Sequence, residues 1–364
     1  MFRGVSEADA HKEGTFMKPR NLRSTALASL SILVWTLLDP APALVGAKVD
    51  CGPVTNTGAD LPRIAAIATN PAGTGAHAIA ASLAAVGSKA TPISVKVQPY
   101  NGPNAWMPLL QNAEIEFGIM NILDASMAMS GTGGYPKPFS VVRVVSGGVF
   151  PFTVGILVRD KSDIKQFTDL KGKRVAWDYG GHAVNQTWVE AMLEATGLKP
   201  GEVAQVRVSN LNDGVRGVAE GKIDASITGI GIAVVEEANA TEPIRLLSMP
   251  NTDSVKAALG RYGASIVKQP QATGVKGDTY VVGYPLHLVG STKVSERTVY
   301  TLVKAWWENM DELQTKHPLF KQWTKETQAL VNFTVPYHPG AIKFYKEMGV
   351  WTAKHEAHLK SICG

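Results

Sequence analysis

The chain has 364 residues, of which 45% are hydrophobic and 18% charged, and its formal net charge is +5. At about 150 residues per domain this length predicts two compact units, and the composition, without low-complexity tracts, excludes a fibrous or largely disordered protein. The basic residues are not clustered as they are in nucleic-acid binders, so nucleic acid is not an expected partner.

The N-terminal region predicts an export signal. Three basic residues between positions 18 and 23 precede the apolar run 26–38, and prolines follow at positions 40 and 42. This run is shorter than the roughly 20 residues of a membrane-spanning helix, and prolines end it directly. We therefore predict a signal peptide and a protein secreted across the inner membrane into the periplasm of a Gram-negative type of cell, with an uncleaved anchor as the alternative.

Small residues place the cleavage after Ala47 or, as a second choice, after Ala43. Residues 1–47 are thus assigned to the signal peptide, and translation can start at Met17 because residues 1–16 precede the charged region. Removal of residues 1–47 leaves 31 basic against 27 acidic residues, still a mild charge. The cysteines, Cys51 and Cys363, are predicted to form a disulfide in an oxidising compartment or to remain free thiols near the two chain ends.

Strands and helices alternate along the first part of the predicted mature chain, as in an α/β sheet. The predicted elements are strands at 64–69, 93–97 and 117–120, a helix at 76–86 and a helix that begins at Pro103. Residues 141–158 form a long apolar run with several glycines, which we interpret as paired strands.

The alternation restarts after Lys173 and predicts a second doubly wound unit. Its elements are strands at 174–177, 204–208, 223–228 and 244–247 and helices at 182–195, 213–220 and 232–240. Residues 249–277 read as irregular, strand 279–289 follows, and residues 295–363 read as helical, with Trp306 and Met310 facing the core. If strands 153–158 and 279–289 lie side by side, they form a two-strand hinge between two lobes.

Three glycine-containing turns connect predicted strands to predicted helices. They are Gly73-x-Gly75, residues 101–104 and residues 179–182. The first resembles a dinucleotide fingerprint, which leaves an NAD-dependent oxidoreductase as an alternative, but strand 93–97 is not followed by the acidic residue that would hold the ribose. Glycine at a helix N-terminus lets backbone N–H groups approach an anion, so we expect the turns to meet at one cleft.

Two histidines, His77 and His182, fall at the first turn of predicted cleft helices, where they could hydrogen-bond a carboxylate. The chain lacks a G-x-S-x-G elbow, an H-E-x-x-H metal motif and paired CxxC, and His355-x-x-His358 alone makes a poor metal site. We therefore predict no enzyme activity, no cofactor and no metal.

Several segments, taken in order, resemble the TAXI family of TRAP-transporter solute receptors over nearly the whole predicted mature chain. These segments are residues 73–77, 116–121, 164–175 and 221–225, of which 169–175 reads DLKGKRV and 221–225 reads GKIDA. The resemblance implies an α/β, type II periplasmic-binding-protein fold, with lobe 1 at 48–160 and 275–364 and lobe 2 at 165–270.

The family's ligand loops correspond here to a set of residues that the resemblance predicts to bind the ligand. The set is Thr74, Gly75, Ala76, His77, Asn101, Pro103, Asn104, Asn121, Tyr179, Gly180, Gly181, His182, Ala183, Thr228, Gly229 and Ile230. The chain departs from the family pattern in three places. Residues 77–79 lack the family's tyrosine pair, Gly102-Pro103 replaces the family's Gly-Ser turn, and residues 179–183 replace its G-S-G-T stretch. These departures touch the expected ligand shell.

The expectation is therefore a monomeric periplasmic receptor that captures a small carboxylate, of the dicarboxylate or acidic amino acid class, between two lobes. It would deliver that ligand to the membrane subunits of a TRAP-type permease. A binding-protein-like sensor that acts without a transporter is the other alternative.

Overall fold

A ten-stranded sheet runs through the described part of the computed structural model, which comprises residues 49, 51–56, 58 and 60–363. The predicted signal peptide lies outside these residues. The main strand order is β2-β1-β3-β10-β4-β7-β5-β6, with β8 on β4 and β9 on β10. The strands are β1 Ile64–Thr69, β2 Ser94–Pro99, β3 Phe117–Asn121, β4 Val142–Arg159, β5 Arg174–Ala176, β6 Ala204–Val206, β7 Ala225–Gly229, β8 Ile244–Leu246, β9 Ser265–Lys268 and β10 Tyr280–Ser291.

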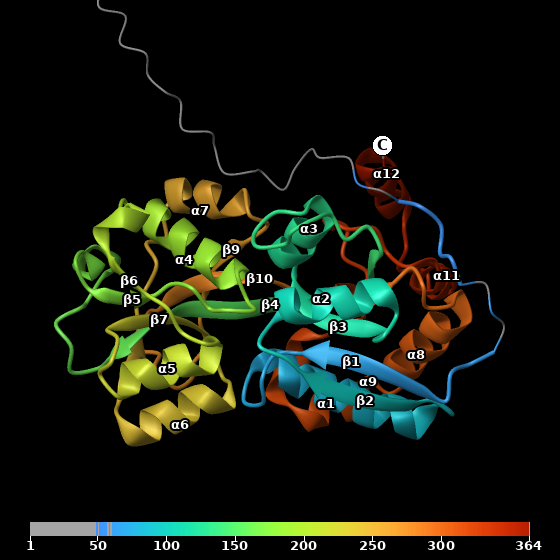
Figure 1. Cartoon of the computed structure of the whole chain (residues 1–364), viewed down its shortest axis with the longest axis horizontal. Helices are drawn as coiled ribbons and strands as arrows, with labels where there is room; N and C mark the ends of the chain where they lie inside the picture. The colour runs from blue at the N-terminus through green and yellow to red at the C-terminus, as the bar shows by residue number, and fades with distance from the viewer. Residues whose placement is uncertain (1–48, 50, 57, 59, 364) are drawn as a thin grey trace, which may run out of the picture. The chain divides into compact units, whose positions relative to one another are not determined.

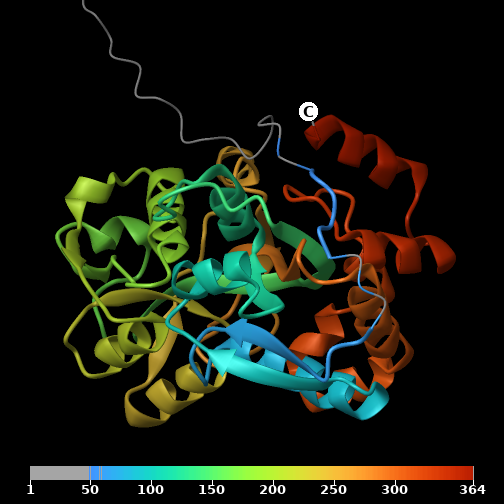
Figure 2. The ribbon, with the colours of Figure 1, turned by 45° about the vertical axis from the view of Figure 1, so that its right-hand side comes forward.

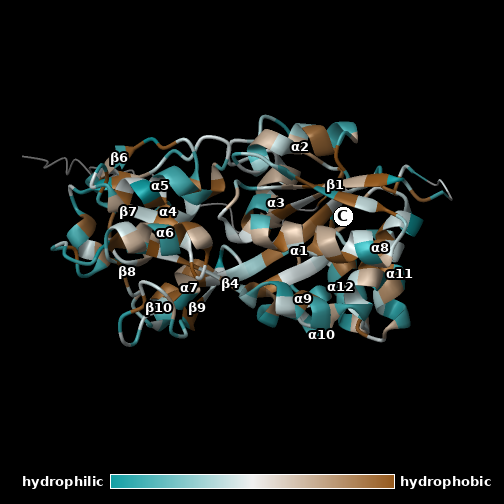
Figure 3. Ribbon diagram, turned by 90° about the horizontal axis from the view of Figure 1, so that it is seen from below, coloured by the Kyte–Doolittle hydropathy of each residue, from teal (hydrophilic) through white to brown (hydrophobic). Residues whose placement is uncertain are grey.

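Helices cover this sheet and alternate with its strands in the first two thirds of the chain (Figure 1). Figure 3 shows hydrophilic and hydrophobic residues together on these helices, as expected where one face packs on a sheet and the other meets solvent. The α-helices are α1 Gly75–Ala90, α2 Pro103–Asn112, α3 Ile122–Ser130, α4 Val184–Ala195, α5 Leu211–Ala219, α6 Ala233–Thr241, α7 Asp253–Gly260, α8 Glu296–Glu308, α9 Met310–Lys316, α10 Lys325–Gln328, α11 Pro339–Glu347 and α12 Ala353–Ile362.

Lobe 1 is the part built on β1, β2 and β3, and lobe 2 is the part built on β5, β6 and β7. Within each lobe these strands are parallel, and helices connect them. Strands buried by helices must be apolar along most of their length, as β1 and β3 are. The carboxyl ends of the parallel strands, where ligands bind in open α/β sheets, are followed by α1, α2 and α3 in lobe 1 and by α4, α5 and α6 in lobe 2.

Two long strands, β4 and β10, connect the lobes. They pair antiparallel with each other, from Val282 opposite Val154 to Ser291 opposite Val142. One end of β10 also pairs with β3 of lobe 1, and the far end of β4 pairs with β7 of lobe 2, so the β4–β10 pair joins the strands of the two lobes into one sheet. This two-strand connection of two doubly wound lobes confirms the predicted type II periplasmic-binding-protein fold, and the lobe boundaries remain a proposal.

Helix α8 packs on α1 through the apolar face that the helical periodicity predicted. Trp306 of α8 is buried and its Nε1 donates a hydrogen bond to the carbonyl oxygen of Leu83, 2.9 Å away, which anchors α8 on α1. Met310 is buried as well. Both side chains therefore belong to the core.

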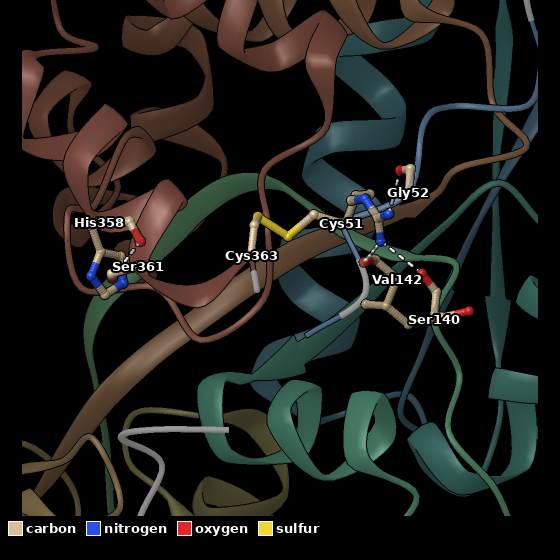
Figure 4. Close-up of a disulfide and its surroundings, with 8 residues drawn as sticks. Cys51, Gly52, Ser140, Val142, His358, Ser361 and Cys363 are labelled. Carbon is tan, nitrogen blue, oxygen red and sulfur yellow. Dashed lines mark hydrogen bonds between the residues drawn. A yellow bond between two sulfur atoms is a disulfide. The ribbon is translucent and has the colours of Figure 1, made fainter. Parts of the chain in front are cut away.

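The two ends of the described chain lie side by side (Figure 2), and a disulfide between Cys51 and Cys363 joins them (Figure 4). The Cα atoms of the two cysteines are 5.4 Å apart. Next to the bridge, the guanidinium of Arg143 donates hydrogen bonds to the carbonyl oxygens of Gly52 and Ser140, both at 2.7 Å. The segment that follows Cys51 is thereby held on lobe 1 by a covalent bond and by buried polar contacts.

Three regions differ from the sequence prediction. Residues 142–159 form one continuous strand instead of a pair. Gly148 has φ +77° and lies where the pairing of this strand with β10 is irregular. Residues 249–277, predicted irregular, contain α7 and β9. Helix α3 was not predicted, because its sequence, ILDASMAMS, is buried on almost every side and has no amphipathic period.

None of the helices in the described residues is both long and apolar enough to cross a membrane.

Candidate functional site

A cavity of about 40 Å³ lies where the helix N-termini of the two lobes face each other. Room of this size holds about three water molecules. Both lobes and both connecting strands contribute to its wall. The residues that line it are Asn70, Thr74, Gly75, Ala76, Ile119, Met120, Asn121, Phe152, Val154, His182, Asn185, Leu211, Ile227, Thr228, Gly229, Ile232, Tyr284 and Leu286.

The N-terminus of α1 forms one side of the cavity. Thr74 caps this helix: its hydroxyl accepts a hydrogen bond from the backbone N–H of His77 at 3.3 Å and donates to the carbonyl oxygen of Pro71 at 2.8 Å. The N–H groups of Gly75 and Ala76 come first in the helix and have no intrahelical acceptor. A Cβ at position 75 would lie 2.7 Å from the ring of Phe152, so only glycine lets the helix approach so closely.

Helix α3 begins beside α1 with a buried polar cluster. Asn121 caps α3 by accepting from the N–H of Asp124 at 2.9 Å. The side chain of Asp124 is fully buried; its Oδ1 accepts a hydrogen bond from the Tyr135 hydroxyl at 2.6 Å, while its Oδ2 has no hydrogen-bond partner among the described residues. Burial raises the pKa of Asp124 to about 7, although the Tyr135 hydrogen bond acts in the opposite direction.

Lobe 2 presents His182 to this cluster. The Nε2 atom of His182 is 3.7 Å from Oδ2 of Asp124, and its Nδ1 is 3.1 Å from Nδ2 of Asn185. An amide nitrogen only donates, so Nδ1 accepts and Nε2 carries the proton of the neutral ring. Burial lowers the pKa of His182 to about 4, so the ring is neutral near pH 7.

An aromatic row forms the wall contributed by the connecting strands. The ring of Phe152 on β4 is 5.9 Å from that of Tyr284 on β10, and Tyr284 stacks on Trp188 of α4 with 4.7 Å between ring centroids. Gly229 faces Phe152 from lobe 2, where a Cβ would lie 2.9 Å from the ring. The ring of Phe152 is thus enclosed between Gly75 of lobe 1 and Gly229 of lobe 2.

The structure brings part of the predicted ligand set to this cavity. The predicted residues that line it are Thr74, Gly75, Ala76, Asn121, His182, Thr228 and Gly229. Each of these residues lies at or next to the carboxyl end of a strand or the start of a helix. Their role in binding stays a prediction.

The other predicted residues lie outside the cavity lining. Tyr179 is in the core of lobe 2, where its hydroxyl is 3.2 Å from Oγ of Ser226. Ile230, which directly follows Gly229 in the chain, is also buried. His77 is half-buried on α1 and directly follows Ala76, the last residue of this helix that lines the cavity. The remaining residues outside the lining are Asn101, Pro103, Asn104, Gly180, Gly181 and Ala183.

Those remaining residues belong to two turns that meet each other. The N–H of Asn104 donates to the carbonyl oxygen of Gly181 at 3.1 Å, and Oδ1 of Asn104 accepts from the N–H of Ala183 at 2.9 Å. Of the residues in these two turns only His182 lines the cavity, and the role of the three glycine turns in ligand binding stays a prediction. In this conformation the other residues of the two turns contact each other across the lobe boundary, beside the cavity.

A second set of contacts joins the lobes at the turn before α1. Nδ2 of Asn212 donates to the carbonyl oxygen of Ala72 at 2.8 Å, and the N–H of Val234 donates to that of Gly73 at 3.3 Å. The N-termini of α5 and α6 are thereby held against the N-terminus of α1. The lobes are closed around the cavity.

Sequence reasoning missed several cavity residues, including Asn70, Phe152, Asn185 and Tyr284. Phe152 and Tyr284 lie near the middle of β4 and β10, the two strands that connect the lobes. Their place on the connecting strands could have indicated that they face the space between the lobes. Among the described residues, no group of three or more His, Cys, Asp or Glu side chains is arranged to hold a metal ion.

Several solved structures align with this chain at low sequence identity. A protein of Bordetella bronchiseptica RB50 aligns over 79% of this chain and 98% of its own with a TM-score of 0.50 and 13% identity, which shows a common fold. An ancestral arginine-binding protein aligns over 72% of this chain and 99% of its own (TM-score 0.47, 17% identity). The aliphatic sulphonate binding protein of Escherichia coli aligns over 82% and 84% (TM-score 0.44, 15% identity).

A family match covers most of the same residues. The NMT1-like family matches residues 67–349, from β1 to the turn after α11, so the match includes both lobes and every residue that lines the cavity. The chain belongs to the NMT1-like family.

Proposed function

We propose that this protein is a periplasmic solute receptor that binds a small organic anion between its lobes and delivers it to a membrane permease. The observation that carries the proposal is the cavity itself, at which the N-termini of α1, α3, α5 and α6 converge. None of the described residues that line the cavity is a lysine or an arginine. A site built from helix N-termini supplies positive potential without a cationic side chain.

The electrostatics of this arrangement favour an anion. Each helix N-terminus carries a partial charge of roughly +0.5 e and presents N–H groups that lack an intrahelical acceptor. A carboxylate placed against Gly75 and Ala76 would accept hydrogen bonds from two such groups. Because His182 is neutral, the dipoles and the backbone amides would provide the charge complement.

The size of the cavity favours a solute of few atoms over a dinucleotide. About 40 Å³ is far too little for a nicotinamide cofactor in the closed conformation. Residues Gln98 and Pro99 stand at the end of β2, where a dinucleotide site would carry an acidic residue. These two observations support binding and release over NAD-dependent catalysis.

Closure of the lobes is the expected response to the ligand. The interlobe hydrogen bonds of Asn104 and Asn212 form only when the lobes are together, so a ligand that touches both lobes gains free energy only in the closed state. The resemblance to TAXI receptors supports a TRAP-type permease as the partner that reads this closed form.

A thermal-shift and calorimetric comparison of matched pairs tests the proposal. Purified protein is titrated with acetate, propionate, succinate and glutamate, and each acid is compared with its neutral amide. A ligand at 100 times its Kd stabilises the native state by about 2.7 kcal/mol, which raises the melting temperature by several degrees. Stabilisation by acids and not by amides is expected, and the absence of any anion-dependent shift would contradict the proposal.

Delivery needs its own experiment. Uptake of a radiolabelled carboxylate into proteoliposomes that contain the permease is expected to require the receptor. Uptake at the same rate without the receptor would show that it acts in sensing instead of transport.

A further inference from the structure

The sheet forms one wall of the cavity. Four neighbouring strands, in the order β3-β10-β4-β7, contribute residues to the lining. Tyr284 stands opposite Phe152, and Val154 stands opposite Gly229. Residues that stand opposite each other share one face of a sheet, as do residues two positions apart in a strand. The apolar and aromatic side chains of this face that line the cavity, which we call the apolar wall, are Ile119, Phe152, Val154, Ile227, Tyr284 and Leu286.

The apolar wall begins next to the N-terminus of α1. A Cβ at position 75 would lie only 2.7 Å from the ring of Phe152, so this ring is the immediate neighbour of the Gly75 backbone. A carboxylate that accepts hydrogen bonds from the N–H groups of Gly75 and Ala76 therefore has apolar surface beside it. The remainder of such a ligand would lie against that surface.

The polar side chains of the lining are engaged within the protein, and none of them carries a formal charge near pH 7. Thr74 and Asn121 cap α1 and α3, and Nδ2 of Asn185 donates to His182. The hydroxyl of Thr228 donates to the carbonyl oxygen of the next residue at 3.1 Å. Among the described residues that line the cavity there is no lysine, arginine, aspartate or glutamate. A second carboxylate or an ammonium group on the ligand would thus be buried without a side chain of opposite charge, which is costly.

We propose that the receptor selects short monocarboxylates with a hydrocarbon body, such as propionate and butyrate, over dicarboxylates, hydroxy acids and amino acids. The inference rests on the proposed function, because it assumes that the carboxylate of the ligand occupies the N-terminus of α1. It replaces the dicarboxylate or acidic amino acid expected from the sequence. The helix amides complement one negative charge, and the hydrocarbon body covers the apolar wall. The cavity of about 40 Å³ agrees with a ligand of few atoms.

Isothermal titration of the wild-type protein with matched acids is the primary test. Propionate is compared with glycolate and glycine, in which a hydroxyl or an ammonium group replaces the methyl group. Butyrate is compared in the same way with 3-hydroxypropionate and β-alanine, and malonate and succinate are the corresponding dicarboxylates. We expect propionate and butyrate to bind at least about tenfold more tightly than these analogues, whose second polar group is left unpaired against the apolar wall. Propionate should bind about fourfold more tightly than acetate, because it buries one more CH₂ group.

A substitution assigns the preference to the apolar wall. Val154→Thr keeps the shape of the side chain and adds a hydroxyl to the wall, so the ratio of propionate to glycolate affinity should fall at least about threefold. Val158→Thr is the matched control. Val158 is fully buried on the same strand and the same face but lies outside the cavity lining, so this variant should keep the wild-type ratio. Melting curves show that each variant is folded, and the wild-type ratios need no variant.

The outcomes separate the two proposals. If carboxylates bind and propionate has no tenfold advantage over glycolate, glycine and malonate, the inference is refuted and the anion receptor stands. If no carboxylate binds, the proposed function fails and this inference fails with it. An unchanged ratio in folded Val154→Thr, or an equal loss in Val158→Thr, would refute the role of the apolar wall.

Discussion

A single methyl group at position 102 is expected to hold the lobes apart. Gly102 has φ +151° and stands in lobe 1 directly opposite lobe 2. A Cβ there would lie 2.8 Å from the carbonyl carbon of Gly181 and 2.5 Å from Cβ of His182, and closer still to the Gly181 carbonyl oxygen. Backbone atoms cannot yield locally, so Gly102→Ala must displace one lobe from the other.

The magnitude follows from the contacts that the displacement breaks. The N–H of Asn104 and the N–H of Ala183 each take part in one interlobe hydrogen bond beside position 102. Two such bonds contribute about 1–3 kcal/mol together, and a closed state disfavoured by that amount weakens the apparent affinity roughly 5- to 150-fold. Each lobe should keep its own core.

Gly197→Ala is the matched control. Gly197 also has a positive φ, +87°, but no atom lies within 4 Å of its virtual Cβ. Both variants carry a backbone cost of about 1–3 kcal/mol, whereas only Gly102→Ala should weaken binding. Calorimetric Kd values and the ligand-induced decrease of the radius of gyration in small-angle scattering measure the effect. Wild-type affinity together with wild-type compaction in Gly102→Ala would refute the reasoning.

Three further predictions concern stability and the helix caps. Replacing Cys51 and Cys363 by serine opens a loop with a sequence separation of 312. The free energy of unfolding should then fall by about 2–4 kcal/mol, and the entropy of closing so long a loop sets an upper limit of about 6 kcal/mol. Urea denaturation measures this change, and an unchanged midpoint would contradict a stabilising role of the disulfide. Burial lowers the pKa of His338 to about 4, so on acidification this histidine is protonated in the unfolded chain before it is protonated in the folded protein. About 3 kcal/mol of stability is therefore lost as the pH falls from 6.5 to 4. His338→Asn, which can still cap α11, should make the melting temperature less dependent on pH over that range, and an unchanged slope would count against this residue. Thr74→Ala should destabilise α1 by about 1 kcal/mol and weaken anion binding, whereas Thr74→Ser should behave as wild type in melting and titration.

The periodicity of the sequence was sufficient to predict most of lobe 2 and the first strand of lobe 1. Strand β1 has the predicted bounds, and α6 and β8 differ from theirs by one residue. These elements are short, local and strongly patterned. Helix α3 and β9 were missed because a short helix that is buried on almost every side and a short edge strand carry no clear local period.

The candidate site divides in the same way. Glycine at strand-to-helix turns indicated the N-terminus of α1, and the structure places Thr74 and Gly75 at the cavity. The turn at residues 101–104 has the same local signal, yet it binds the opposite lobe. The two turns have the same local sequence features. The relative position of the lobes decides which turn lines the cavity and which turn contacts the opposite lobe.

What the sequence determined by itself was the alternation of strands and helices, because propensity and hydrophobic period act within a few residues. Only the tertiary structure decided that Asp124 faces His182, that Phe152 lies between two glycines and that Cys51 is bonded to Cys363. These residues are far apart in the chain, and their encounter depends on the packing of the whole sheet and on the two strands that cross between the lobes.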